Sequence, residues 1–248
     1  MEIKDVKTKK PKKKKKSGIK KAAIVILVLL LLAGILFVLT QTVLFKIKKV
    51  EIKGSKIYSP QEIADASKIS AGDLLFSVNN ENKCKNITAT LPYIKTVSVG
   101  QKIPDTLVIT VTDDTAAYQI EDNGIYFLAD KDYKILEQTD KEKEGLILII
   151  GSGIKSPKPG QKAVFEDKTK LDVLENLVKK CDTYENMTLS KIDLTDNVYL
   201  NFTVNKTVDV KLGSTTEIDY KLSHLSGMLK ELPINVRGEV NLESYTAK

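Results

Sequence analysis

The chain has 248 residues, with 39 lysines and arginines against 32 aspartates and glutamates, and a formal net charge of +7. An apolar content of 42% is ordinary for a globular protein, so disorder of the whole chain is excluded. Two cysteines and a single histidine are too few for a disulfide scaffold or a zinc site. The length leaves room for one large or two small domains.

The positive charge is concentrated at the N-terminus. Residues 1–21 hold eleven lysines and two acidic residues, whereas the rest of the chain holds 28 basic and 30 acidic residues. Arg237 is the only arginine, the residue that nucleic-acid readers favour, so no nucleic-acid partner is expected. We interpret the lysine tail as a topology signal that also attracts anionic lipid. A binding site for a specific cytoplasmic partner is the less favoured alternative.

A long apolar segment follows the tail. Residues 22–39 carry no polar side chain and the apolar character continues to Phe45, so 24 helical residues would reach about 36 Å, enough to cross a bilayer. A cleavable signal peptide is the competing interpretation, but its apolar region is about 7 to 15 residues long. We expect a transmembrane helix over 22–45. The positive-inside rule then places residues 1–21 in the cytoplasm and everything after the helix outside.

Residues 46–113 predict a small β-α-α-β-β domain. A strand that contains Val50 and Ile52 comes first, and the tetrapeptide 59–62, Ser-Pro-Gln-Glu, then predicts a capping box that opens a helix ending near Ser67. A second helix is expected over 80–90, before a proline. Alternating apolar residues then predict two antiparallel strands, and the domain becomes a small sheet with two helices on one face.

Five spaced segments of this domain carry a family resemblance. They are Val50-Glu51-Ile52-Lys53-Gly54, Ser59-Pro60-Gln61-Glu62-Ile63, Gly72-Asp73-Leu74-Leu75, Leu91-Pro92-Tyr93-Ile94 and Pro104-Asp105-Thr106-Leu107-Val108-Ile109-Thr110-Val111. Directly after a single anchor, they resemble the FtsQ-type POTRA domain of the bacterial FtsQ/DivIB cell-division family. Ser55 departs from the family's frequent asparagine, and Asp113-Asp114-Thr115 departs from its usual Glu-Arg-x-Pro.

Residues 114–248 predict a second domain that is rich in strands. Expected strands cover 117–120, 125–129, 133–137, 146–150, 190–194, 198–204, 208–212 and 234–245, with helices over 166–181 and 217–232. Asn123-Gly124 predicts a hairpin turn, and the wholly apolar run 146–150 predicts a central strand buried on both faces. The domain resembles the family's β domain, with flanking helices. The predicted fold class is therefore α+β.

No catalytic, cofactor-binding or metal site is predicted, and the chain is not expected to be an enzyme. His224 has no acidic residue nearby in sequence to orient it as a general base. Residues 151–153, Gly-Ser-Gly, lack the lysine of a phosphate loop. The acids Asp113, Asp114 and 142–144 are expected to be solvated. Whether Cys84 and Cys181 pair is left open.

The last strand is predicted to bind a partner, because a C-terminal edge strand has nothing after it to cover it. The family resemblance implies small bitopic partners, an FtsB/DivIC-like protein with an FtsL-like protein, bound at the final strand and adjoining helix. On this chain that assigns the contact to Leu242, Glu243, Ser244 and Tyr245. Tyr245 is the expected anchor, although it could instead close the domain core. Glu243 stands where the family often has arginine.

Taken together, the resemblance implies a single-pass scaffold of the divisome at the septum. It would link early and late division proteins and stabilise septal peptidoglycan synthesis, with a septal peptidoglycan synthase as a further partner and no cofactor. The POTRA-like domain would either contact division proteins or act as a spacer. The alternative is a membrane-anchored extracytoplasmic enzyme or an envelope sensor that uses a POTRA-like domain for another purpose.

Overall fold

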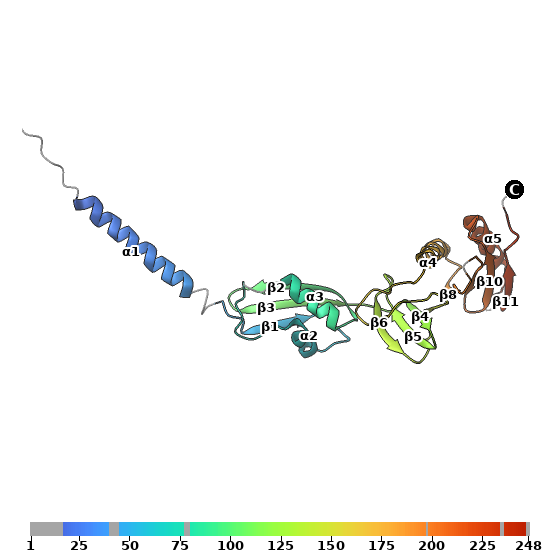
Figure 1. Cartoon of the computed structure of the whole chain (residues 1–248), viewed down its shortest axis with the longest axis horizontal. Coiled ribbons are helices and arrows are strands. Elements are labelled where there is room, and N and C mark those ends of the chain that lie inside the picture. Colours follow the sequence, from blue (N-terminus) through green and yellow to red (C-terminus); the bar gives the residue numbers. More distant parts are fainter. Residues whose placement is uncertain (1–16, 40–44, 77–79, 197, 234–235, 247–248) are drawn as a thin grey trace, which may run out of the picture. The chain divides into compact units, whose positions relative to one another are not determined.

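The structure is a computed structural model that describes residues 17–39, 45–76, 80–196, 198–233 and 236–246 (Figure 1). It contains two compact units. The first comprises Met1–Val50, Ser70–Val78 and Gln101–Leu107, and the second comprises Glu51–Ile69, Asn79–Gly100 and Val108–Lys248. The domains predicted from the sequence are not the same as these units, because the POTRA-like domain contributes to both.

The N-terminal helix α1 (Ser17–Leu39) is long and apolar enough over Lys21–Leu39 to cross a membrane, and its side chains from Lys21 onward are exposed. It begins before residue 22 because Lys20 and Lys21 have good helix propensity and continue it toward the tail. Residues 40–44 of the expected helix lie outside the described residues. Phe45 lies in a turn, so the prediction that the helix includes it is wrong.

The POTRA-like domain has the predicted β-α-α-β-β order. Its elements are β1 (Lys49–Lys53), α2 (Pro60–Ser67), α3 (Asn80–Thr90), β2 (Ile94–Lys102) and β3 (Thr106–Asp113). The strands form a sheet in the order β1-β3-β2, and α2 packs against α3 (Figure 1). The predicted capping box is confirmed, because the Ser59 hydroxyl accepts from the N–H of Glu62 at 3.3 Å while the Glu62 carboxylate accepts from the N–H of Ser59 at 2.8 Å.

The second domain is built on one mixed sheet of eight strands in the order β11-β10-β9-β8-β7-β4-β5-β6. Its elements are β4 (Tyr118–Asp122), β5 (Ile125–Ala129), β6 (Ile135–Thr139), β7 (Ile147–Ile150), α4 (Lys168–Cys181), β8 (Leu189–Asp193), β9 (Leu200–Val204), β10 (Val208–Gly213), α5 (Ile218–Glu231) and β11 (Gly238–Asn241). The predicted hairpin turn is confirmed, because Asn123 and Gly124 both have positive φ, at 53° and 79°. The predicted α+β class is also confirmed.

Both helices of this domain cover the same face of the sheet. Helix α4 connects the parallel neighbours β7 and β8, and α5 connects the parallel neighbours β10 and β11. The two connections step across the sheet in the same direction, so right-handed crossovers place both helices on one side. An ion pair between Lys180 of α4 and Asp219 of α5 joins them. On the opposite face, β8, β9 and β10 carry exposed or half-buried side chains, whereas Gln119, Leu128 and Leu136 of β4, β5 and β6 are buried.

The core lies between the sheet and these two helices. Alternate residues of the strands point into it, as Val208, Val210 and Leu212 of β10 do, and Leu174 and Leu222 of the helices are fully buried against them. Strand β7 is central, as predicted, but the expectation that it is buried on both faces is wrong. Only its third residue, Ile149, is fully buried, and Leu148, which points to the face opposite the helices, is half-buried.

All predicted strands of this domain except the last have ends within two residues of the observed ones, and two strands differ for an identifiable reason. The strand expected at 133–137 begins at Ile135, because Tyr133 has a φ of 62° in a turn in which the Asp130 carboxylate accepts two backbone N–H groups. The last strand is shorter than the expected 234–245. Residues 234–235 lie outside the described residues, and β11 ends at Asn241, whose side-chain oxygen accepts the N–H of Glu243 at 2.9 Å.

Candidate partner-binding surface

Strand β11 forms one edge of the eight-stranded sheet. Within the described part of the chain it pairs with β10 and has no strand on its other side. The N–H groups of Gly238 and Leu242 donate to backbone carbonyls on the β10 side, at 3.2 and 2.8 Å. Hydrogen bonding alternates along a strand, so the N–H and C=O groups of Glu239 and Asn241 point away from β10. The edge therefore offers a short ladder to an incoming strand.

The four predicted contact residues lie after β11 and not within it. Leu242 is fully buried in the core, so its side chain is not available to a partner. Glu243 and Ser244 are exposed, and Tyr245 is half-buried, with its N–H donating to the carbonyl of Leu242 at 3.2 Å. The accessible part of the predicted set is thus reduced to three residues in a turn at the end of the edge strand.

Tyr245 belongs to a row of three rings that extends onto α5. The ring of His224 lies 4.6 Å from that of Tyr220 and 5.5 Å from that of Tyr245, both edge to face. We call these three residues the aromatic row. Sequence reasoning did not include Tyr220 and His224 in the site, although their spacing of four residues places them on one helical face. Tyr220 and His224 are exposed, so the row is accessible from solvent.

A groove of about 320 Å³ opens beside the start of β11. Its apolar lining comes from the end of α5, the segment that follows it and the start of β10: Val208, Leu229, Leu232, Pro233 and Val236. Leu232 is 38% exposed. The edge, the aromatic row and this groove together give the end of the sheet a surface suited to an extended or helical peptide.

The described residues contain no group of three or more histidine, cysteine, aspartate and glutamate side chains that could hold a metal ion. Nor does a described carboxylate hydrogen-bond to the ring of His224. Cys84 and Cys181 are both free thiols. Burial raises the pKa of Cys181 to about 12 and also raises that of Cys84, so neither is a reactive thiolate at neutral pH.

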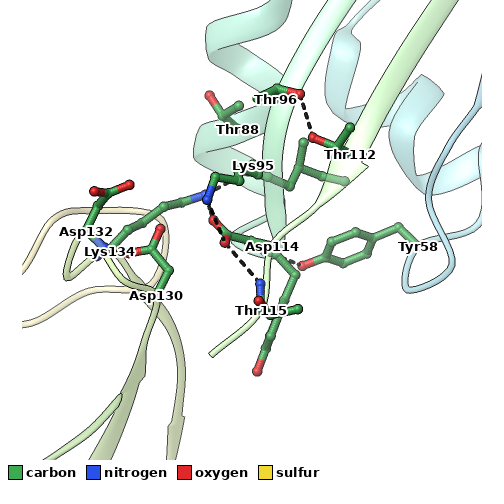
Figure 2. Close-up of polar contacts among 12 residues, drawn as sticks. Tyr58, Thr88, Lys95, Thr96, Thr112, Asp114, Thr115, Asp130, Asp132 and Lys134 are labelled. Carbon is green, nitrogen blue, oxygen red and sulfur yellow. Dashed lines mark hydrogen bonds and ion pairs between the residues drawn. The ribbon is translucent and has the colours of Figure 1, made fainter. Parts of the chain in front are cut away.

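The prediction that Asp113 and Asp114 are solvated acids is wrong. Asp113 accepts hydrogen bonds from the Ser55 hydroxyl and the N–H of Lys56, both at 2.6 Å. Asp114 is only 3% exposed. Figure 2 shows it at the end of β3, facing Lys95 and Lys134, whose amino groups each lie 3.9 Å from its carboxylate. No local sequence signal indicates this burial, because Lys134 lies twenty residues further along the chain.

Asp130, from the turn after β5, also faces the group formed by Asp114, Lys95 and Lys134 (Figure 2). Burial raises the pKa of Asp130, and the neighbouring Asp114 carboxylate raises it further, against two backbone N–H groups that lower it. Burial has the opposite effect on a lysine and lowers the pKa of Lys134. Its amino group donates to the carbonyl of Ile94 at 2.7 Å. One oxygen of Asp114 is buried without a donor. The ion pair of Asp114 with Lys134 joins the end of β3 to the turn that precedes β6.

These features define a class of protein before any comparison is made. An apolar helix long enough to cross a membrane precedes a β-α-α-β-β domain and a mixed sheet with a free edge, and the described residues show no assembled catalytic centre. Such a chain is a membrane-anchored protein whose described surface is suited to binding other proteins.

Comparison with known proteins points to bacterial cell division. Residues 45–113 match the family model "POTRA domain, FtsQ-type". "Cell division protein DivIB" of Clostridium acetobutylicum is 28% identical over 200 residues, covering 80% of this chain and 79% of the relative. DivIB of Clostridium tetani is 26% identical, covering 75% and 70%, and "Cell division protein FtsQ" of Geotalea daltonii is 26% identical, covering 82% and 74%. Residues 45–113 thus form an FtsQ-type POTRA domain, and the chain is similar over most of its length to cell-division proteins of the DivIB and FtsQ type.

Proposed function

We propose that this protein is a non-enzymatic divisome scaffold that binds small bitopic division proteins of the FtsB/DivIC and FtsL type. Through them it links early and late division proteins, and it stabilises septal peptidoglycan synthesis. The observation that carries the proposal is the free edge of β11 beside the aromatic row. A partner strand would pair with the outward groups of Glu239 and Asn241, while Tyr245 and its neighbours supply apolar contact.

The pairing is tested with a proline at the edge. Glu239→Pro removes an N–H that points away from β10, so it blocks an added strand without removing a hydrogen bond to β10. Glu239→Ala is the matched control, because both variants lose the exposed ion pair with Lys211. In co-purification of the full chain from membranes, Glu239→Pro is expected to lose at least tenfold of the DivIC-like partner and Glu239→Ala to retain it. Equal recovery from both variants would refute strand pairing.

The aromatic contact is tested separately by Tyr245→Lys, which places a charge in the row. Val164→Lys is its control, because Val164 is 57% exposed and lies in a loop hydrogen-bonded to Lys155, outside the β11 surface. We expect Tyr245→Lys to reduce partner recovery severalfold and Val164→Lys to leave it unchanged. If Tyr245 only closes the core, the variant will instead lower the melting temperature while bound partner per folded chain stays constant.

The proposal also assigns location and orientation: N-terminus in the cytoplasm, residues after α1 outside, and enrichment at the division septum. The lysine tail supports this orientation through the positive-inside rule. Protease added to intact protoplasts should digest the domains after α1 and spare an N-terminal tag. Depletion should give a division defect, and normal division without the protein would overturn the wider assignment.

A further inference from the structure

Three loops of the POTRA-like domain are joined at the end where the chain leaves the anchor. We call residues 45–48, 70–76 and 101–105 the basal loops; all belong to the first compact unit. Backbone and side-chain hydrogen bonds join them: Ile47 N–H to Asp73 O at 2.8 Å, Leu75 N–H to Phe45 O at 2.8 Å, Lys48 N–H to Asp105 O at 2.9 Å and Gln101 Nε2 to Leu75 O at 2.8 Å. The basal loops therefore form one ordered surface and not three independent turns.

This surface exposes large apolar side chains. Ile103, at the tip of the β2–β3 turn, is 67% exposed, which is the highest value of any large apolar residue in the described chain, α1 included. Phe76 is 49% exposed and packs its ring edge to face on Phe45, with centroids 5.0 Å apart. Leu74 is 37% exposed. Exposed apolar side chains gathered on hydrogen-bonded loops are a common mark of a contact surface.

The basal loops also carry lysines. Lys46, Lys48 and Lys102 are all exposed in the same loops. Lys48 is paired with Asp105 at 3.5 Å, but its side chain remains 70% exposed, so the ion pair is weak and can be exchanged for another anion. Long lysine side chains can lie along an apolar surface while the amino group reaches a polar layer. Aromatic and aliphatic side chains bordered by lysines are typical of a membrane interface.

The length of the connection limits where this surface can be. Six residue steps separate Leu39, the last residue of α1, from Phe45. At about 3.5 Å per residue, Phe45 lies within about 21 Å of the end of the helix. The polar headgroup layer beyond the hydrocarbon core is itself several ångströms thick. A bilayer crossed by α1 is thus always within reach of the basal loops.

From these observations we infer that the basal loops are a second membrane contact, in which Ile103, Phe76 and Leu74 enter the headgroup layer of the bilayer that α1 crosses. Lys46, Lys48 and Lys102 bind the phosphates of anionic phospholipids. A lipid surface is favoured over a protein partner for three reasons. The apolar side chains fit the bilayer interior, the lysines fit its anionic phosphates, and the short connection to α1 keeps the same bilayer close. The inference rests on α1 as the anchor and is independent of partner binding at β11.

The test places an environment-sensitive nitrobenzoxadiazole probe on Ile103→Cys in the full chain, reconstituted alone into bilayers. Cys84 is replaced by serine, and Cys181 stays because it is buried. Val164→Cys is the matched control, since Val164 is similarly exposed but lies in the β domain. With phosphatidylglycerol bilayers, spin-labelled lipid is expected to quench the Ile103 probe at least threefold more than the Val164 probe.

Two outcomes would overturn the inference. One is equal quenching at both positions. The other is an Ile103 probe that leaves water only after coiled-coil division partners are added, which would identify the surface as a protein interface. Replacing Lys46, Lys48 and Lys102 with glutamine should reduce quenching in phosphatidylglycerol at least twofold and leave it unchanged in phosphatidylcholine. The same loss in both lipids would contradict the proposed binding of the lysines to anionic phosphates.

Discussion

Asp130 illustrates how a single buried carboxylate can lower stability at neutral pH. Its pKa is raised in the folded protein, so the folded state binds the proton more tightly than the unfolded state does. The sign follows from this difference: stability falls as the pH rises through the folded pKa, and the charged form at neutral pH is the costly one. The Asp130 carboxylate nevertheless organises its turn, because it accepts the N–H groups of Asp132 and Lys134, each at 2.8 Å.

Asp130→Asn should therefore stabilise the protein. The amide oxygen can still accept both N–H groups, while the buried negative charge is removed. We expect the melting temperature of the full chain in detergent to rise at pH 7.5 by about 2 to 4 °C, the shift that about 1 kcal/mol gives in a protein of this size. The gain should disappear as the pH falls toward 4. Asp132→Asn, in the same turn but exposed, should change nothing; a lower melting temperature for Asp130→Asn at every pH would contradict the account.

Lys221 is a buried lysine whose amino group hydrogen-bonds to backbone carbonyls. Its side chain is 2% exposed, and its amino group donates to the carbonyls of Leu212 at 2.8 Å and Ser214 at 3.0 Å. Lys221→Met keeps the apolar stem but leaves both carbonyls without this donor at the end of β10. We expect a loss of about 2 to 3 kcal/mol in the free energy of unfolding, measured with urea. Lys230→Met, on the exposed side of α5, is the control, and equal stability of both variants would show that water replaces the amino group.

At the scale of elements, Gly54 allows the segment that follows β1 to come close to β3. Its φ is 107°, and a Cβ at this position would lie 1.9 Å from the carbonyl oxygen of Val111. Gly72 has a similar φ of 96°, but no atom lies within 4 Å of the position that a Cβ would take there. Gly54→Ala should cost more than about 3 kcal/mol, because steric overlap adds to backbone strain, whereas Gly72→Ala should cost about 1 kcal/mol. Similar melting temperatures for the two variants would rule out the close approach.

The elements that the sequence predicted well are those with local signals. The capping box at Ser59 and the hairpin at Asn123-Gly124 depend on residues a few positions apart, and both are present. The end of β11 and the burial of Asp114 depend on contacts that the sequence does not reveal. The first is set by the Asn241 side chain and by pairing with β10, and the second by Lys95 and Lys134 from other strands and turns.

The candidate surface was predicted only in part for the same reason. Its location at the last strand followed from chain order and from the family resemblance. The participation of Tyr220 and His224 required knowing that α5 returns beside the turn that holds Tyr245. Whether these residues bind a partner stays a prediction until the variants are measured.

For the whole molecule, the lysine tail should decide orientation. Replacing the nine lysines between Lys4 and Lys16 with serine leaves Lys20 and Lys21 before the apolar segment and Lys46, Lys48 and Lys49 after it. The charge difference across the anchor is then reversed, so a substantial fraction of chains should insert the wrong way round. A membrane-impermeant maleimide applied to intact cells should label Val164→Cys less in this background. Unchanged labelling would mean that folding of the outer domains sets orientation.

The shortness of β11 has a consequence for where binding can occur. Glu239 and Asn241 supply two outward N–H and two outward C=O groups, and net contributions of about 0.5 to 1.5 kcal/mol per hydrogen bond amount to about 2 to 6 kcal/mol, a dissociation constant no tighter than some tens of micromolar. Such an edge is too weak to retain a freely diffusing peptide. Two chains anchored in one bilayer search a thin layer instead of a volume, which raises their effective concentration. The anchor would then contribute to recognition as well as to location.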